Sequence, residues 1–302
     1  MDKVMNNFEL FITAPNGCGS ALELLKSLDL QLEENIVVTI LENAENCSEA
    51  HLPPISFVLK HSFYSSLEEA AMRRDAFFTS NSDWLVFLED HVLISSTFIK
   101  ELERYISNPG ATGAATFYAL NGTPKSLGSR TLFSWVWGMA ESKQYPRKPE
   151  PVCSAFLVKR SSILEVINEE NTDLRIGELE TKLIPKIIGG SKSEFTTFME
   201  IVHFEYVDLR VGAMAIYSNS RIMGHLERRL TSWWVWPFHM ASRYLLRPWR
   251  IHKVDPKSFA ENLCLYYLAL VGLVGVTAGR FFGIGSADIN LANAHPKISK
   301  CT

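Results

Sequence analysis

The chain has 302 residues, of which 47% are hydrophobic and 21% are charged, so it is long and apolar enough to bury a substantial core. This composition excludes a mainly disordered protein, and a formal net charge of −3 gives no reason to expect a nucleic-acid-binding protein. The length allows one large domain with an appendage, or two smaller domains.

The first ninety residues alternate strand patterns with helical patterns. Strands are expected at residues 8–13, 36–41, 55–59 and 84–88, and helices at 21–30 and 66–79. The segment 84–88 (WLVFL) is a continuous apolar run, as in a strand that is covered on both faces. The alternation predicts an α/β fold in which helices flank a mostly parallel central sheet. In such sheets, ligands bind beyond the carboxyl ends of the strands.

The patterns continue downstream with less regularity. Helices are expected at residues 95–105 and 161–168 and from about Glu178, and strands within 110–120 and at 152–159. Residues 199–206 (MEIVHFEY) are expected to form a strand or loop that carries His203. Residues 121–148 are rich in Gly, Pro, Ser and aromatic residues, and we expect loops there.

The composition shifts at Thr231, which we take as the start of a second region, so that the domains are 1–230 and 231–302. Four of the seven tryptophans fall in this region, interleaved with cations at Arg243, Arg247, Arg250 and Lys253. Aromatic rings beside cations suit the headgroup layer of an anionic membrane. Residues 231–285 are therefore expected to contact such a surface.

Residues 262–279 contain no charge, but a helix that spans a bilayer needs about 20 apolar residues. We expect a helix that faces or partly enters the bilayer. One alternative is a purely soluble enzyme, in which this region forms a helical hairpin packed on the main domain or a dimer contact. The other alternative is a helix that crosses the membrane fully.

The five cysteines are widely spaced and include no CxxC pair, which argues against a disulfide framework and against a structural zinc site. The apolar stretch at the N-terminus is interrupted by Glu9 and is too short for a secretory signal. These features predict a cytoplasmic protein.

The strongest local signal for chemistry is the tripeptide Glu89-Asp90-His91, directly after the apolar strand at 84–88. Carboxylates with an imidazole suit a divalent cation such as Mg²⁺ or Mn²⁺, which typically bridges the oxygens of a diphosphate. The alternative is a helix N-cap and a surface turn, where acidic residues also gather.

Several segments in order resemble the family 2-type nucleotide-sugar glycosyltransferases of GT-A fold. They are FITAPNG with LLKSLDLQ, Arg73-Arg74-Asp75, SDWLVFLEDHV, IGELETKLIPKIIGG and SNSRIMGHLERR, and the resemblance covers about residues 8–230. It implies that Glu89, Asp90 and His91 stand where the commoner D-x-D motif holds the nucleotide diphosphate and its metal.

The resemblance also implies a catalytic base that deprotonates the acceptor hydroxyl. The segment Glu178-Leu179-Glu180 stands at the place of the later acidic motif, with Glu180 the best match and Glu178 the second choice. A single base opposite the departing diphosphate implies in-line attack and inversion at the anomeric carbon. The alternative for both residues is the solvated first turn of an acidic helix.

Further residues match positions that bind the donor in this family. His203 matches a histidine near the metal or diphosphate, with a buried core residue as the alternative. Arg221 and Arg228 match a basic motif that clamps phosphate, with a solvated surface as the alternative.

Arg74, or its neighbour Arg73, matches a contact to the nucleotide, with surface charge on a helix as the alternative. Asn16 and Glu42 follow the first two strands, where the family binds the nucleoside, although the local sequences APNG and LENAEN depart from the usual patterns.

These features together predict an inverting glycosyltransferase that uses a nucleotide-sugar donor and a divalent cation. Its acceptor is expected to be lipid-linked or a nascent glycan, as in polysaccharide biosynthesis, with residues 121–148 forming an acceptor lid. Its expected place is the inner face of the cell membrane, peripherally bound, with a homodimer as a further option.

Two other functions are the alternatives to this interpretation. A sugar nucleotidyltransferase needs a basic, Gly-rich loop after the first strand, and APNGCGS contains no basic residue. The other rival is a degenerate transferase that serves as a membrane scaffold, which the replacement of D-x-D by EDH leaves open.

Overall fold

The computed structural model describes residues 8–15, 17–32, 36–45, 54–65, 69–108, 113–122, 126–137, 155–170, 196–204, 208–228 and 232–285. The described residues form two compact units. The sheet unit contains those from Phe8 to Leu120 and from Ala155 to His203. The helical unit contains those from Asn121 to Trp137 and from Phe204 to Gly285.

The sheet unit is built on an eight-stranded sheet in the order β3-β2-β1-β4-β7-β6-β8-β5. The strands are β1 (Phe8–Ala14), β2 (Val37–Asn43), β3 (Val58–Tyr64), β4 (Trp84–Glu89), β5 (Val92–Ile94), β6 (Ala114–Asn121), β7 (Phe156–Lys159) and β8 (Thr196–His203). Strands β3, β2, β1 and β4 are parallel, whereas the pairs β4–β7, β6–β7 and β5–β8 are antiparallel. The α/β fold with a mostly parallel central sheet, expected from the sequence, is confirmed.

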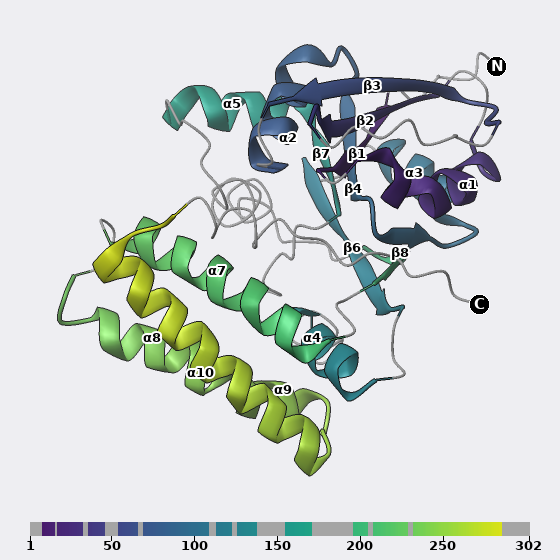
Figure 1. Ribbon diagram of the computed structural model, residues 1–302. Helices are drawn as coiled ribbons and strands as arrows, with labels where there is room; N and C mark the ends of the chain where they lie inside the picture. The colour runs from purple at the N-terminus through teal and green to yellow at the C-terminus, as the bar shows by residue number, and fades with distance from the viewer. Residues whose placement is uncertain are drawn as a thin grey trace. The chain divides into compact units, whose positions relative to one another are not determined.

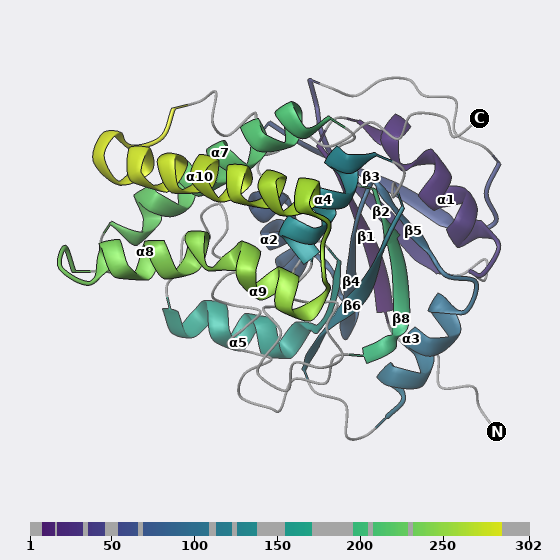
Figure 2. The same ribbon diagram turned by 90° about the horizontal axis from the view of Figure 1, so that it is seen from below.

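Helices cover both faces of this sheet (Figures 1 and 2). They are η1 (Cys18–Ala21), α1 (Leu22–Asp29), α2 (Glu69–Thr79), α3 (Phe98–Ile106) and α5 (Arg160–Glu170). Both views place α1 and α3 on one side and α2 and α5 on the other. A run of buried rings joins the α2 side to the sheet, because Phe87 stacks on both Phe11 and Phe156 and meets the edge of Phe77. Such aromatic pairs add to the burial of apolar area that holds helix and sheet together.

One predicted strand is displaced. The apolar run at 55–59 predicted its position, but β3 spans Val58–Tyr64 and most of its side chains are at least partly exposed. It lies at the edge of the sheet, where pairing with β2 rather than a buried apolar face determines its extent. The helix expected from Glu178 lies outside the described residues.

The helical unit contains α4 (Leu127–Trp137), α7 (Leu209–Glu227), α8 (Trp236–Leu245), α9 (Arg247–Val254) and α10 (Phe259–Phe282). Its core gathers buried side chains from all five helices, among them Leu132, Ile216, Met240, Ile251 and Leu268. Helix α4 falls where the sequence predicted loops, because its Gly and Ser residues mask an apolar face that is buried only in the tertiary structure. The boundary placed at residue 231 falls inside this unit, between α7 and α8.

Glycines let α7 and α10 approach until their backbones touch. A Cβ atom on Gly279 would lie 1.8 Å from the carbonyl oxygen of Arg221, and one on Gly224 would lie 1.9 Å from that of Val276. The closest approach of Gly275 is to the Tyr217 carbonyl, at 2.4 Å. The contact of Gly275 with Tyr217 is followed by that of Gly279 with Arg221, so α7 and α10 run in the same direction. No residue larger than glycine fits where their backbones meet. We call this contact the glycine seam.

The substitution Gly279→Ala should lower the free energy of unfolding of the helical unit by about 3 kcal/mol, since the added methyl group meets backbone that cannot move aside. Tryptophan fluorescence during urea unfolding reports mainly on this unit, because six of the seven tryptophans lie in it. Ala260→Leu, at an exposed position of the same helix, is the control and should change stability little. Equal stability of the two variants would contradict the glycine seam.

Helix α10 begins with a capping box. The hydroxyl of Ser258 accepts a hydrogen bond from the Glu261 backbone, and the Glu261 side chain accepts one from the backbone of Ser258. Arg130 of α4 donates a further hydrogen bond, of 3.0 Å, to the same carboxylate. Burial alone would raise the pKa of Glu261, but the hydrogen bonds from Ser258 and Arg130 and the charge of Arg130 lower it to about 2.

Because this pKa is depressed, the carboxylate stabilises the fold above its ordinary pKa of 4.5, and the contribution is lost as the pH falls towards 2. Because water screens this partly exposed pair, we expect Glu261→Gln to cost about 1 kcal/mol at pH 6 and progressively less between pH 4.5 and 2. Urea unfolding at several pH values measures this difference. Glu165→Gln, at an exposed position of α5, is the control, and a pH-independent loss for Glu261→Gln would contradict the ion pair.

Candidate functional site

The tripeptide Glu89-Asp90-His91 lies at the carboxyl end of β4, as the sequence predicted. All six residues of β4 are buried, and β4 is enclosed by β1 on one side and β7 on the other. The parallel register sets Thr13 beside Glu89, and the amide of Asp90 donates a 3.1 Å hydrogen bond to the Thr13 carbonyl. The backbone of the tripeptide is therefore held by the centre of the sheet.

His203 comes to the same place through strand pairing. The short strand β5 directly follows the tripeptide and pairs with β8 in a register that sets Val92 opposite His203. His203 Nε2 lies 3.1 Å from Glu89 Oε2 and 3.1 Å from His91 Nε2, and His91 Nε2 lies 3.0 Å from Glu89 Oε2. All three side chains are buried. We call Glu89, His91 and His203 the ligand cluster.

The ligand cluster fits a divalent metal ion. Its three ligand atoms lie within 4.8 Å of one another and offer two imidazole nitrogens and one carboxylate oxygen. Two ligands at right angles about an ion at about 2.1 Å are about 3 Å apart, which matches the three distances. Imidazole suits Mn²⁺ and other transition ions better than Mg²⁺, which prefers oxygen.

Asp90 lies behind His91 rather than among the three ligand atoms. Its Oδ1 is 2.9 Å from His91 Nδ1, so it accepts a hydrogen bond from the ring nitrogen that faces away from the cluster. Its Oδ2 accepts a hydrogen bond from the hydroxyl of Ser20 in η1. A carboxylate in this position fixes the tautomer and the ring orientation of a metal-binding histidine. Asp90 is thus placed to orient His91, and its role as a metal ligand, expected from the sequence, stays a prediction.

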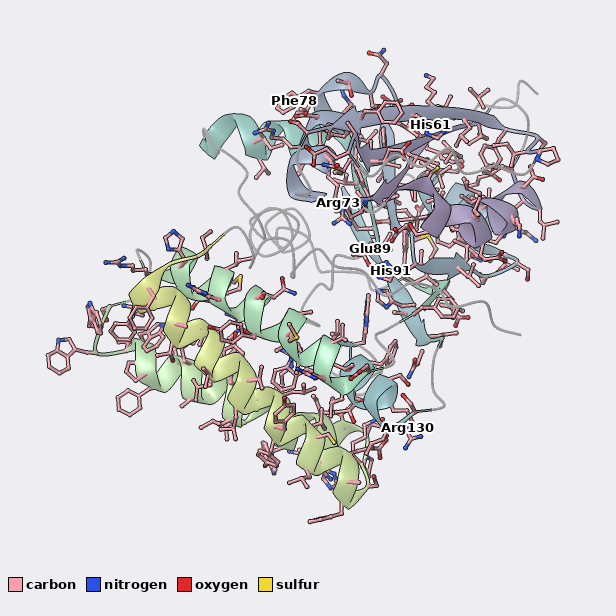
Figure 3. All side chains as sticks on the ribbon, in the orientation of Figure 1. His61, Arg73, Phe78, Glu89, His91 and Arg130 are labelled. Atoms are coloured by element: carbon pink, nitrogen blue, oxygen red, sulfur yellow. The ribbon has the colours of Figure 1, made fainter. Side chains whose placement is uncertain are left out.

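A buried arginine adjoins the ligand cluster. Arg73 of α2 donates a 3.1 Å hydrogen bond to the Thr13 hydroxyl, and its guanidinium lies 3.6 Å from Glu89 Oε1. Figure 3 shows Arg73, Glu89 and His91 close together. Its neighbour Arg74, the residue favoured from the sequence, instead pairs with Asp75 and is partly exposed. Helical geometry turns consecutive side chains about 100° apart, so only one of the two can face the sheet.

Opposite charges stabilise one another inside the site. Burial alone would raise the pKa of Glu89, but the charge of His91 and hydrogen bonds from His203 and His91 hold it well below its usual range. Burial alone would lower the pKa of His91, but Glu89 and Asp90 raise it well above its usual range. Glu89 and His91 therefore form a buried ion pair.

The structure places the other predicted residues as follows. Glu42, at the end of β2, is buried, accepts a 3.1 Å hydrogen bond from the Cys18 amide and lies 2.5 Å from His61 Nδ1. It lies in the sheet unit, at the carboxyl end of a strand as expected, and its contact with a nucleoside stays a prediction. Asn16, Glu178 and Glu180 lie outside the described residues.

Arg221 and Arg228 belong to the helical unit. Arg221 Nε donates a 2.7 Å hydrogen bond to the Gly283 carbonyl, just beyond the end of α10. Arg228 follows the end of α7 and is exposed. Their contact with phosphate stays a prediction.

No family model and no curated protein sequence matches this chain. Among solved structures, it is similar to the mannosyltransferase PcManGT from Pyrobaculum calidifontis in complex with GDP-Man and Mn²⁺, with a TM-score of 0.58 and 11% identity over 91% of this chain and 87% of that one. The fold is that of a GT-A-type glycosyltransferase. Weaker similarities are to S. aureus TarS 1-349 in complex with UDP (TM-score 0.46, 10% identity, 90% of each chain) and to GalNAc-T7 with UDP, GalNAc and Mn²⁺ (TM-score 0.49, 15% identity, 69% of this chain and 45% of that one).

Loss of the orienting carboxylate should weaken metal binding without removing a ligand. We expect Asp90→Ala to lower the affinity for Mn²⁺ by about 10- to 100-fold, and His203→Ala to lower it further. Electron paramagnetic resonance of free and bound Mn²⁺ measures both affinities, after circular dichroism has shown that the variants are folded.

Asp90→Asn tests the same point with a nearly unchanged shape, and it should give an intermediate affinity. Asp75→Asn, a surface change on α2, is the control and should bind Mn²⁺ like the natural protein. Natural affinity in Asp90→Ala together with loss in His203→Ala would show that Asp90 does not position His91.

Proposed function

We propose that this protein is an inverting glycosyltransferase that moves a sugar from a nucleotide-sugar donor to a lipid-linked or nascent glycan acceptor. The observation that carries the proposal is the buried ligand cluster at the carboxyl end of β4, in a fold shared with a mannosyltransferase that was solved with GDP-Man and Mn²⁺. A scaffold that had lost the chemistry would have no need to keep two histidines and a carboxylate in this buried arrangement.

Glu89, His91 and His203 would hold the divalent cation. When bound, such a cation neutralises negative charge that develops on the departing nucleoside diphosphate. Asp90 orients His91 through its far ring nitrogen, and Ser20 holds Asp90. Arg73 places a positive charge beside Glu89, and its hydrogen bond to the Thr13 hydroxyl of β1 holds it there.

Glu180 is the proposed base, with Glu178 as the second choice. The resemblance of the segment 176–190 to the acidic motif of the family supports this assignment. A carboxylate on the face of the sugar opposite the diphosphate would take the acceptor proton as the acceptor oxygen attacks the anomeric carbon. Attack and departure are then in line, the configuration inverts, and the transition state resembles an oxocarbenium ion.

We propose a separate role in donor binding for each of the remaining residues. Asn16 and Glu42 would contact the nucleoside, Arg221 and Arg228 the phosphates. For the arginine near the nucleotide, we propose Arg73, with Arg74 as the alternative, and the burial of Arg73 beside Glu89 supports this choice.

The proposed place of work is the cytoplasmic face of the cell membrane, where lipid-linked acceptors of polysaccharide biosynthesis are found. The aromatic and basic composition of residues 231–285 supports it. A homodimer is compatible with this arrangement.

The substitution Glu180→Gln should abolish turnover and leave donor binding intact, because it removes the proton acceptor and keeps the shape. Release of UDP or GDP from a panel of nucleotide sugars in the presence of Mn²⁺ measures turnover, which we expect to fall at least about 100-fold. Calorimetry with UDP or GDP and Mn²⁺ measures binding, which should be unchanged. Glu178→Gln tests the second choice, and Glu165→Gln, at an exposed position of α5, is the control. Natural turnover in Glu180→Gln would reject the assigned base.

A further inference from the structure

Helix α10 presents two different faces. One face is buried against the rest of the helical unit and contains Leu265, Leu268, Ala269, Gly272, Gly275, Val276, Gly279 and Arg280. The opposite face is exposed and contains the large side chains Phe259, Leu263, Tyr266, Tyr267, Leu270, Val274, Phe281 and Phe282. We call the second set the outer stripe.

The outer stripe contains no charged residue. The two charged residues of α10 lie elsewhere, since Arg280 is buried and Glu261 is bonded to Arg130. A helix of 24 residues is about 36 Å long, so the stripe is an apolar strip of this length. Exposed apolar surface of such extent on a folded unit marks an interaction site.

Aromatic residues next to α10 extend the apolar surface. Helices α8 and α9 pack beside α10 (Figures 1 and 2). Their exposed rings are those of Trp234 (89%) just before α8, Phe238 (79%) in α8 and Trp249 (54%) in α9. The ammonium group of Lys253 lies 5.4 Å from the centre of the Trp249 ring. Exposed indole rings with cations beside them match the layer of headgroups on a membrane.

We propose that the outer stripe and the exposed rings of Trp234, Phe238 and Trp249 dock this protein onto an anionic lipid bilayer, with α10 lying in the plane of the membrane. This deepens the membrane location in the proposed function and rests on it. The glycine seam holds α10 against α7 and so keeps the outer stripe facing outward.

Charge favours lipid over a second copy of the chain. The described residues of the helical unit contain ten Arg and Lys residues against four Asp and Glu residues. A twofold contact between two such units would bring like charges together, whereas phosphatidylglycerol or another anionic lipid complements them.

The packing of α10 opposes a full crossing of the bilayer. Within the described residues, α10 is the helix long and apolar enough to span a membrane, yet a third of its most apolar window is buried within the protein. The Arg280 guanidinium lies between the rings of Trp233 and Trp236, at 5.1 and 4.8 Å. A crossing would separate α10 from α7, open the glycine seam and expose this cation to lipid, which is costly.

The first test measures binding of the full-length protein to vesicles by sedimentation. Vesicles of phosphatidylcholine with about 30% phosphatidylglycerol should bind it, and pure phosphatidylcholine should bind it less. The double substitution Leu270→Glu with Val274→Glu should weaken binding at least about tenfold. It replaces two apolar side chains that contact the lipid with carboxylates, which the anionic lipid repels. Leu30→Glu is the matched control, since Leu30 is an exposed leucine (87%) of the sheet unit.

Calorimetry with UDP or GDP and Mn²⁺ shows whether the double variant is folded and keeps its donor site, which separates failure of docking from failure of the proposed function. Unchanged vesicle binding in the double variant would overturn the proposal. A second outcome would also overturn it: the unsubstituted protein is a dimer in solution that binds no vesicles, and the double substitution converts this dimer to a monomer.

The second test measures depth. Nitroxide labels at Leu263, Leu270 and Phe282 are introduced one at a time in a background whose native cysteines are replaced and whose vesicle binding is natural. An α10 helix in the membrane plane gives the three labels similar, shallow depths. Labels at opposite surfaces with Leu270 near the middle of the bilayer would show a crossing helix and overturn the in-plane arrangement.

Discussion

Antiparallel pairing of β5 with β8 is the contact on which the candidate site depends. It sets His203 against Glu89 and His91, although His203 and His91 are 112 residues apart in the chain. Strand β5 has only three residues and follows the tripeptide at once, so the same backbone that displays His91 also recruits its partner. Without this pairing, β4 would still present an acidic tip, but two ligands from one turn make a weak metal site.

The surroundings of the ligand cluster explain how such polar groups tolerate burial. Glu89 has cationic neighbours in His91 and Arg73, while Asp90 accepts hydrogen bonds from His91 and Ser20. Each charge is thus matched by an opposite charge or a donor, which offsets the cost of removing it from water. The same contacts orient the side chains before any ligand arrives, so the site is preorganised.

In the helical unit, close packing of α10 against α7 determines which face of α10 is exposed. The core of this unit gathers apolar side chains from all five helices, and α7 and α10 pack closely because glycines replace larger side chains where they meet. Close packing buries one face of α10 fully and leaves the other uncharged and exposed. A helix held in this way presents an apolar face with no loss of its own structure, which suits attachment to a surface more than insertion through it.

The sequence alone determined the features that depend on local pattern. The run WLVFL predicted a buried strand, the alternation of elements predicted the α/β sheet, and the polar tripeptide after β4 predicted the place of the site. His203 was named as well, because the family resemblance places a histidine there, although the apolar segment by itself is equally typical of a buried core histidine. The mutual geometry of these residues was outside the reach of the pattern, since it depends on which strands pair and in which register.

Only the tertiary structure decided which neighbouring side chain does what. Arg73 rather than Arg74 faces the sheet, and Asp90 lies behind His91. Residues 127–137 form a helix whose apolar face is recognisable only because α7 and α10 cover it. The tertiary structure also split α10 into a buried and an exposed face, where the sequence shows one uniform apolar run. The physical reason is the same in each case: periodicity along a chain reports which residues are apolar, whereas the direction of a side chain and its partner are determined by contacts between segments that lie far apart in sequence.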